Sequence, residues 1–179
     1  MIEDQAGNIW FTSLTHGGVS RYDGKSFRHF MPEDGLSDDM VRSIFETRDG
    51  NIWIGTNGNR KGGLDMYNPK TNQFANYNES NGLCLHENLG KCYNGVNCIY
   101  EDKTGKIWLG NVQGKLCFYD GKTFSTYETE SGQTLRNLLF ALEDKKGNIW
   151  FGVNYGHLYK FDGKTFTDMM MPEKDISKN

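Results

Sequence analysis

The chain has 179 residues, of which 36% are hydrophobic and 13% aromatic, and it contains 22 glycines but only 3 prolines. Its net charge of -3 provides no basic surface, so we expect no nucleic-acid partner. No apolar run approaches the roughly 20 residues of a membrane-spanning helix, and residues 1–4 do not resemble a signal peptide. We therefore expect no direct insertion into a membrane.

One short phrase, in which glycine and an asparagine or lysine precede isoleucine and tryptophan, occurs four times along the chain. It contains the only tryptophans of the protein, which are Trp10, Trp53, Trp108 and Trp150. These tryptophans are 43, 55 and 42 residues apart. A period near 40 residues indicates a repeat architecture. We expect the four tryptophans to occupy equivalent positions in the core between repeats.

Each tryptophan belongs to a unit with four strand-like segments. In the second unit these segments are 41–46, 52–56, 62–67 and 73–77, and turns rich in glycine or asparagine separate them. Together the units form a single domain. In chain order they cover about 1–31, 37–80, 93–128 and 135–171, with an insert at 81–95 and a C-terminal tail at 172–179. We expect no helix beyond one turn at 37–41.

Apolar residues within a third segment lie three positions apart, as Leu64 and Tyr67 do, and so point to opposite faces of a strand. Each small sheet must then be covered on both faces. We therefore expect an all-β fold, a β-propeller of four-stranded antiparallel blades with four repeats present. A two-layer sandwich is the alternative, but it does not predict four identical units.

The arrangement of the four blades is left open by the sequence. They form a partial ring that belongs to a larger one, a closed four-bladed ring, or half of an oligomeric ring such as two chains with eight blades. The repeat spacing places the front of the first strand before Met1 and the next first strand just after Asn179. An open ring would expose apolar blade faces, which favours self-association or contact with neighbouring blades.

Two stretches carry a family resemblance most closely, residues 96–108 and 143–152. They resemble the two-component regulator propeller repeat, in which Glu-Asp at the end of a first strand precedes Gly-Asn-Ile-Trp. Asp-Gly-Lys-Ser/Thr-Phe, at 23–27, 120–124 and 162–166, also fits this repeat. The resemblance implies the sensor region of a bacterial hybrid two-component system, a periplasmic or extracellular location and glycan-derived cues. No kinase or DNA-binding region accompanies the repeats in this sequence.

Most of the length variation between repeats occurs in the loops between second and third strands and in the connections between blades. Both emerge on one face of a propeller, and variable loops on a rigid scaffold often carry binding specificity. Our candidate ligand-binding residues on this face are Arg42, Asn59, Arg60, Asn97, Asn111, Gln113, Arg136, Asn154 and Tyr155. Their polar groups would suit a small glycan or another small molecule, and they would equally suit solvated loops.

No arrangement of residues predicts catalysis, a metal site or a cofactor. The acidic pairs precede a turn in each unit, so turn chemistry explains them better than paired catalytic carboxylates; these pairs are Glu3-Asp4, Glu101-Asp102 and Glu143-Asp144. The four histidines are scattered and accompany no nucleophile in a recognisable motif.

The insert is unlike the rest of the chain because it contains two of the four cysteines. Cys84 and Cys92 could form a disulfide in an oxidising compartment. Together with His86 they could also hold a metal, but their spacing fits no standard zinc pattern, and a plain loop with free thiols is the simpler alternative. Cys98 and Cys117 lie within strand segments and are expected to be packing residues.

The sequence thus favours a non-catalytic propeller module that acts as a sensor, ligand-binding or interaction domain. Two alternatives remain. An enzyme of the propeller-lyase or glycosidase type would need carboxylates or histidines clustered at the propeller axis. A structural fragment would have no ligand of its own.

Overall fold

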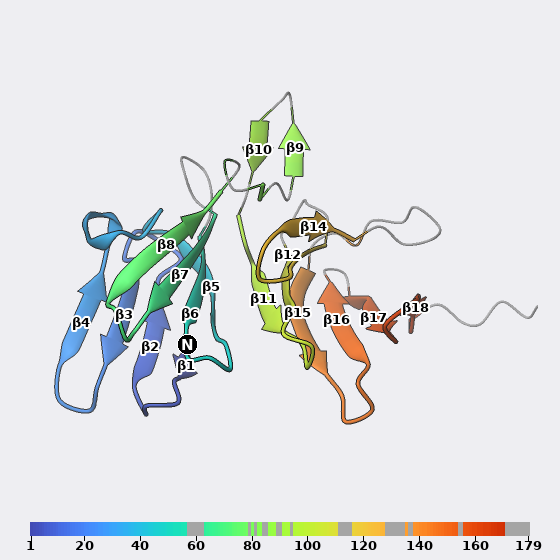
Figure 1. The fold of residues 1–179 in the computed structure, drawn as a ribbon, viewed down its shortest axis with the longest axis horizontal. Coiled ribbons are helices and arrows are strands. Elements are labelled where there is room, and N and C mark those ends of the chain that lie inside the picture. The colour runs from blue at the N-terminus through green and yellow to red at the C-terminus, as the bar shows by residue number, and fades with distance from the viewer. Residues whose placement is uncertain are drawn as a thin grey trace, which may run out of the picture.

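The computed structural model describes residues 1–56, 63–78, 80, 82–83, 86–88, 91–93, 95–110, 116–127, 135, 138–153 and 156–170, with the side chains of 86–88 and 91–93 excepted. The described residues form four antiparallel sheets of four strands each and one two-stranded sheet (Figure 1). Within each four-stranded sheet the strands follow one another in chain order. The expected all-β propeller architecture is therefore confirmed.

The four sheets are the blades, numbered here in chain order. Blade one consists of β1 (Ile2–Glu3), β2 (Ile9–Thr12), β3 (Val19–Tyr22) and β4 (Phe27–Phe30). Blade two consists of β5 (Val41–Glu46), β6 (Ile52–Thr56), β7 (Leu64–Asn68) and β8 (Gln73–Tyr77). Blade three consists of β11 (Cys98–Glu101), β12 (Ile107–Gly110), β13 (Cys117–Tyr119) and β14 (Phe124–Thr126). Blade four consists of β15 (Leu138–Glu143), β16 (Ile149–Val153), β17 (Leu158–Phe161) and β18 (Phe166–Asp168).

Two elements lie outside the blades. The insert contains a hairpin of β9 (His86–Asn88) and β10 (Lys91–Tyr93), which projects beyond the ends of blades two and three in Figure 1. A short 3-10 helix, η1 (Pro32–Asp34), follows blade one. The single helical turn therefore lies a few residues before the expected 37–41, where Pro32 begins it and Gly35, at φ 111°, ends it.

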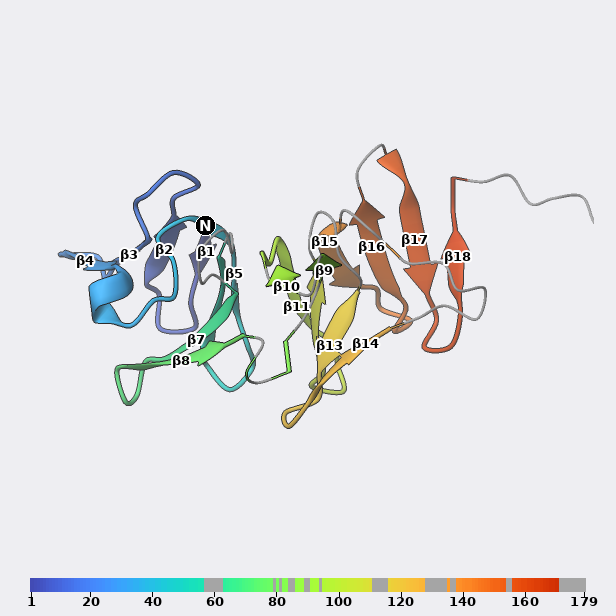
Figure 2. The same cartoon turned by 90° about the horizontal axis from the view of Figure 1, so that it is seen from above.

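The first strands β1, β5, β11 and β15 lie together at the centre of the molecule, and the fourth strands lie outermost (Figure 2). Seen from above, blades one and four extend to opposite sides, and blades two and three lie between them on one side. The four blades thus form an open arc. The described residues therefore do not form a closed four-bladed ring, because blades one and four lie at opposite ends of the arc.

Consecutive blades meet at three junctions, and each junction contains one hydrophobic cluster. Trp10 lies in the cluster between blades one and two, Trp53 in the next and Trp108 in the third. These three side chains are at most 3% exposed. Two of them stack on the aromatic residue that ends the fourth strand, Trp10 on Phe30 and Trp53 on Tyr77.

The fourth tryptophan departs from the expected core position. Trp150 is only half-buried, because it lies on the face of blade four that no other blade covers. Its neighbour Leu142, directly opposite in the sheet, is 49% exposed. The repeated sequence therefore places the tryptophan on the same face of every blade, and a following blade is what buries it.

Candidate functional site

A pocket of about 270 Å³ lies at the axis of the arc, where the four first strands converge. Residues from all four blades line it: Met1 and Thr12, Arg42 to Ile44, Asn97 to Ile99, and Leu139 to Ala141. Most of these residues stand at or near the beginnings of the first strands, where the connections between blades arrive. The pocket thus lies toward the loop end of the blades, the face on which we expected a ligand site.

Two of the nine candidate ligand-binding residues, Arg42 and Asn97, line this axial pocket. Arg42 is the second residue of β5, its side chain is exposed, and within the described part of the chain it makes no hydrogen bond or ion pair. Asn97 precedes β11, and its backbone N–H donates to the carbonyl of Gly110 at 2.8 Å. That bond holds the Asn97 backbone against the end of β12 in the same blade and leaves its side-chain amide for another partner.

The lining of the axial pocket contains a single guanidinium and no carboxylate among its residues. Hydroxyls and an amide lie beside it, and Ser43 is held in place because its hydroxyl donates to the carbonyl of Val96 at 2.8 Å. The rest of the wall is apolar, with Phe140 51% and Leu139 46% exposed. An aromatic surface next to a cation and neutral hydrogen-bonding groups is suited to a small polar or anionic ligand with an apolar face.

Phe140 also lines the pocket, although it is not among the candidate residues expected from the sequence. It occupies the position of Ser43 in blade two and Cys98 in blade three, where it pairs across the sheet with Gly152. A phenylalanine in a strand is normally a core residue, so composition alone could not identify it. One signal in the sequence could have identified it: at this position of the innermost strand, blades two and three have a small side chain and blade four has a large one.

The other seven candidate residues lie outside the described residues: Asn59, Arg60, Asn111, Gln113, Arg136, Asn154 and Tyr155. Cys84 also lies outside them, and Cys92 lies in β10, whose side chains are not described. The disulfide and metal interpretations of the insert therefore remain predictions. Cys98 and Cys117 are free and buried, and burial raises the pKa of each thiol to about 12, so both are protonated packing residues.

The acidic pairs at the ends of the first strands perform structural tasks. The aspartate accepts the indole N–H of the repeat tryptophan in blades one, three and four, at 2.7, 2.8 and 2.9 Å. The same carboxylate accepts backbone N–H groups of the turn, as Asp102 does from Thr104 and Lys106. In blade two Thr47 replaces the aspartate, and Asp49 accepts from Thr47 and Asn51 instead.

These bonds change the acidity of the turn aspartates. Burial acts to raise the pKa of Asp102, but the hydrogen bonds from Thr104 and Trp108 act in the opposite direction, and the net pKa is below the usual value. The same balance lowers the pKa of Asp4. For Asp144 the hydrogen bond from Trp150 is the largest cause of a lowered pKa. All three are thus ionised turn anchors, whereas a general acid needs a raised pKa.

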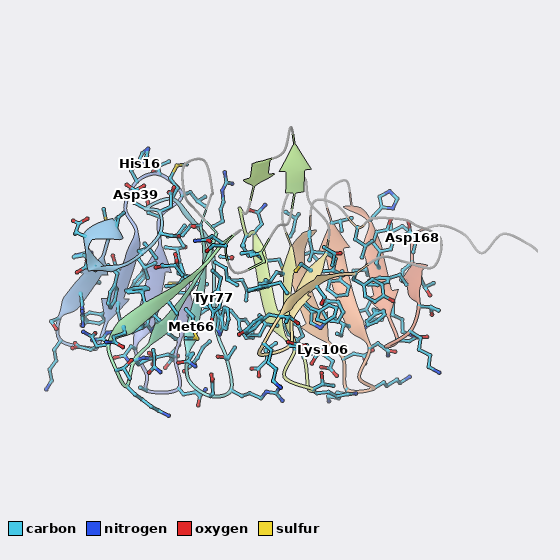
Figure 3. The ribbon with its side chains drawn as sticks, turned by 45° about the horizontal axis from the view of Figure 1, so that its top comes forward. His16, Asp39, Met66, Tyr77, Lys106 and Asp168 are labelled. Carbon is cyan, nitrogen blue, oxygen red and sulfur yellow. The ribbon has the colours of Figure 1, made fainter. Side chains whose placement is uncertain are left out.

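Two histidine–aspartate pairs belong to loops and strand ends away from the axial pocket. His16 lies 3.0 Å from Asp39, and Figure 3 shows both at the loop end of blade one, opposite to the turn end where Lys106 lies. His157 lies 3.0 Å from Asp168, which joins the ends of β17 and β18. Neither pair is accompanied by a nucleophile, and the described residues contain no cluster of metal-ligating side chains.

Two further grooves lie at the turn ends of the blades, at the second and third junctions. One, of about 550 Å³, includes Trp53, Tyr77 and Glu101, and the other, of about 350 Å³, includes Trp108, Tyr127 and Glu143. Each groove is lined by the turn and the tryptophan strand of one blade and by the first-strand glutamate of the next. Because they recur at equivalent places, they belong to the repeat geometry, and the axial pocket is the more distinctive site.

The fold and its converging first strands define a repeat-built β-propeller. Residues 35–58 and 90–113 match the family model described as two component regulator propeller. The resemblance inferred from the sequence is thereby confirmed: these segments of the chain are two-component regulator propeller repeats. No curated protein matches the chain. Among the described residues, no helix is long and apolar enough to cross a membrane.

Solved structures extend this comparison to more than nine-tenths of the chain. The chain is similar to the extracellular domain of the hybrid two component system BT3049 from B. thetaiotaomicron, with 27% identity and a TM-score of 0.72 over 93% of this chain and 22% of that one. It is also similar to the extracellular domain of the B. thetaiotaomicron system BT4673, with 22% identity and a TM-score of 0.71 over 94% of this chain and 24% of that one. The chain thus spans less than a quarter of the length of these two relatives.

An enzyme shares the fold as well. The virginiamycin B lyase from Staphylococcus aureus has 17% identity and a TM-score of 0.72, over 96% of this chain and 55% of that one. At this identity the similarity shows the propeller fold alone. Fold does not determine function, so any activity of this chain has to be inferred from its own residues.

Proposed function

We propose that this chain is a non-catalytic sensor module that binds a small glycan-derived ligand at its axial pocket, in a periplasmic or extracellular setting. Its repeats match the two component regulator propeller model, and one similar structure is the extracellular domain of a hybrid two component system. Those similarities support a role in signal reception. They do not identify the ligand, which is inferred from the pocket.

The observation that carries the proposal is the lone guanidinium of Arg42 in a pocket without a carboxylate. An arginine can hold a carboxylate or sulfate through two parallel hydrogen bonds. Phe140 offers an exposed ring on another blade of the same pocket, against which the apolar face of a sugar can pack. An acidic sugar, such as a uronic acid at the end of a short oligosaccharide, combines both features.

The pocket also suggests how occupancy is transmitted. Its walls come from four separate blades, so a ligand that contacts Arg42, Asn97 and Phe140 bridges blades two, three and four. A bridging ligand favours one of two relative placements of the blades. It shifts the equilibrium between these placements only as far as its affinities for them differ. Neighbouring domains of a longer protein would sense this change in blade packing.

The test is calorimetric titration of the chain with a panel of short neutral and acidic oligosaccharides. We expect acidic members to bind and the Arg42→Ala variant to weaken them by at least about tenfold, which corresponds to the loss of one charge-assisted bidentate contact. The Lys122→Ala variant removes the same charge from an exposed hairpin in blade three and should bind as the unaltered chain does.

Two results would count against the proposal. If the Arg42→Ala variant bound the acidic oligosaccharides as tightly as the unaltered chain does, the axial pocket would not be their binding site. Turnover of any tested oligosaccharide would favour the alternative of a propeller-type enzyme. If no member of the panel binds, either to this chain or to a longer protein that contains it, the sensor proposal fails and the structural alternative stands.

A further inference from the structure

The groove of about 550 Å³ at the second junction, which we call the aromatic groove, lies at the turn ends of blades two and three. Its wall contains three aromatic residues and one methionine: Trp53, Tyr77, Tyr119 and Met66. The Tyr77 ring stacks on Trp53 with centroids 5.3 Å apart, and Tyr119 lies tilted against Tyr77 at 5.6 Å. Met66 and Tyr77 both pack against the hydrophobic cluster shared by the two blades (Figure 3).

The charges at the aromatic groove favour a cation. Asp49 and Glu101 line it, together with a single basic residue, Arg48. The guanidinium of Arg48 already has partners, because its Nη2 lies 3.0 Å from Glu101 Oε1 and its Nη1 donates to the carbonyl of Lys103 at 3.1 Å. Two carboxylates thus accompany one guanidinium that is paired, so a further cation is attracted more than an anion is.

The first junction shows which group occupies the equivalent place there. Phe30 of blade one has the strand position of Tyr77 in blade two. The guanidinium of Arg28 lies over the Phe30 ring, 4.6 Å from its centroid, and that of Arg21 lies 5.8 Å from the centroid of Trp10. A guanidinium over an aromatic face is a favourable contact. The first junction therefore supplies its own cations to its aromatic residues.

A hydrogen bond fixes the guanidinium of Arg28 in this place. Its Nη1 donates to Oδ1 of Asn72 at 2.5 Å, and the same oxygen accepts the hydroxyl of Tyr67 at 2.7 Å. At the second junction Tyr119 has the position of Tyr67, and its hydroxyl donates to the carbonyl of Gly121 at 3.0 Å. Gly121 also lines the aromatic groove. Its carbonyl oxygen is thus the acceptor that corresponds to Asn72 Oδ1.

Blade two lacks both of these arginines. Met66 has the strand position of Arg21, and Ala75 has that of Arg28. Among the described residues, no cation lies over the ring of Tyr77. The methyl group of Ala75 cannot reach across the ring as an arginine does, so this face of the groove stays open.

The third junction again contains a cation of its own. Lys106 Nζ lies 4.8 Å from the centroid of Phe118, and both residues line the smaller groove of about 350 Å³. At the second junction the residue before the tryptophan strand is Asn51, which is uncharged. Within the described part of the chain, the second junction is thus the one whose aromatic groove has no stacked cation.

We propose that the aromatic groove binds the guanidinium group of an arginine side chain, stacked on Tyr77 and hydrogen-bonded to the carbonyl of Gly121. A guanidinium fits better than an ammonium, because it is planar, stacks on aromatic rings and directs several N–H groups outward in its plane. The arginine belongs to a free amino acid or to a polypeptide. The groove lies at the turn ends of the blades, so this inference does not depend on ligand binding at the axial pocket.

The test is an NMR titration of the ¹⁵N-labelled chain with arginine amide acetylated at its N-terminus. We expect saturable shifts of the backbone amide signals of Tyr77 and Gly121. The citrulline derivative has the same shape without the charge, and it should bind at least about fivefold more weakly. The lysine derivative should also bind more weakly than arginine, since its ammonium cannot stack.

The same titration identifies the source of the arginine. A blocked tripeptide of arginine between two glycines carries the same side chain in a polypeptide. Tighter binding of this peptide than of the single amino acid would identify a polypeptide as the source. Equal or weaker binding of the peptide would identify the free compound.

A variant of the chain can fill the groove from within. In Ala75→Arg the new guanidinium should lie over Tyr77 as Arg28 lies over Phe30, so the arginine derivative should bind at least about fivefold more weakly. Ser125→Arg is the matched control, because it adds the same charge at the same strand position of blade three. It should bind as the unaltered chain does, and so should Arg42→Ala, which alters the axial pocket. Circular dichroism checks the fold of each variant.

Three results would overturn the proposal. The first is the absence of saturable shifts with the arginine derivative. The second is equal affinity for the arginine and citrulline derivatives, a comparison that needs no variant. The third is unchanged binding by a folded Ala75→Arg variant, which would place the bound arginine elsewhere on the molecule.

Discussion

The indole N–H of Trp108 donates to Oδ2 of Asp102 across 2.8 Å, inside the turn that precedes the tryptophan strand. The other carboxylate oxygen accepts from the backbone N–H of Thr104 and Lys106 and from the Thr104 hydroxyl. One aspartate thus fixes the turn, the strand that follows it and the orientation of the largest core side chain. Blades one and four repeat this arrangement at Asp4 and Asp144.

We expect the Asp102→Asn variant to lower the free energy of unfolding by about 1–3 kcal/mol. An amide keeps the shape of the side chain, but its NH₂ group must face N–H donors that need an acceptor. Urea denaturation followed by tryptophan fluorescence measures the loss. Asp120→Asn is the matched control, since Asp120 accepts turn N–H groups in an exposed hairpin. A loss at Asp102 no larger than at Asp120 would contradict the anchoring role.

The lowered pKa of Asp102 predicts how stability responds to acid. Below its usual value of 3.8 the unfolded chain binds a proton at this carboxyl more readily than the folded chain does. The contribution of Asp102 to stability is therefore complete above that value and is lost as the pH falls through the lower folded pKa. Denaturation midpoints from neutral pH down to about pH 2.5 should fall less steeply in Asp102→Asn than in the unaltered chain. Parallel curves would contradict the prediction.

Gly110 lies where Leu138 of the next blade packs onto blade three. A Cβ at this position would lie well inside van der Waals distance of the Leu138 side chain. We expect Gly110→Ala to cost about 1–3 kcal/mol of stability through overpacking. Gly152→Ala is the matched control, because its Cβ would meet only the far end of the Phe140 ring, which is half-exposed and can move away.

The double variant Gly110→Ala with Leu138→Ala tests the cause of this loss. Leu138→Ala removes the Cγ and Cδ2 atoms that the new methyl group would meet but keeps the Leu138 Cβ, so it relieves the overlap only in part. The losses of the two single variants should therefore sum to somewhat more than the loss of the double variant. Chemical denaturation of the four proteins gives the coupling. Strict additivity would mean that the alanine acts on blade three alone.

Glu101 should matter more for stability than its ion-pair partner Arg48. The Glu101→Ala variant removes the acceptor of both the Arg48 backbone N–H and its guanidinium, and it leaves the backbone donor unpaired at the second junction. The Arg48→Ala variant leaves the backbone contact in place and removes the guanidinium, which is largely exposed and also donates to the carbonyls of Asp102 and Lys103. Thermal melting of both variants at low and high salt checks this, with Glu101→Ala expected to melt lower in both. If both variants lowered the melting temperature equally at low salt, and neither lowered it at high salt, the contact would act only as a surface ion pair.

The sequence predicted the strands of blade two closely because local signals there agree. Segments 41–46, 52–56 and 73–77 coincide with β5, β6 and β8. The segment expected at 62–67 is observed as β7 from Leu64 to Asn68. Alternating apolar residues bounded by turn residues specify such short strands without reference to the rest of the chain.

The candidate site was predictable only where a polar residue lies in an innermost strand or directly before one. Arg42 and Asn97 could be named because their positions in the repeat place them near the axis. Phe140 could not, since an apolar residue in a strand carries no sign that its neighbouring blade is missing. Exposure depends on which faces meet in space, and the repeat pattern is the same for a covered face and an open one.

By itself, then, the sequence determined the repeat, the four-stranded blades and the face of each blade on which the tryptophan lies, because hydrogen-bonded turns and strand alternation are local. Only the tertiary structure decided that the four blades form an open arc, that Trp150 is half-buried while Trp108 is buried, and that Arg42 and Phe140 share one pocket. Those facts depend on which blade faces meet in space. The meeting of two faces is decided by how large side chains of neighbouring blades pack together at each junction, which no local sequence pattern specifies.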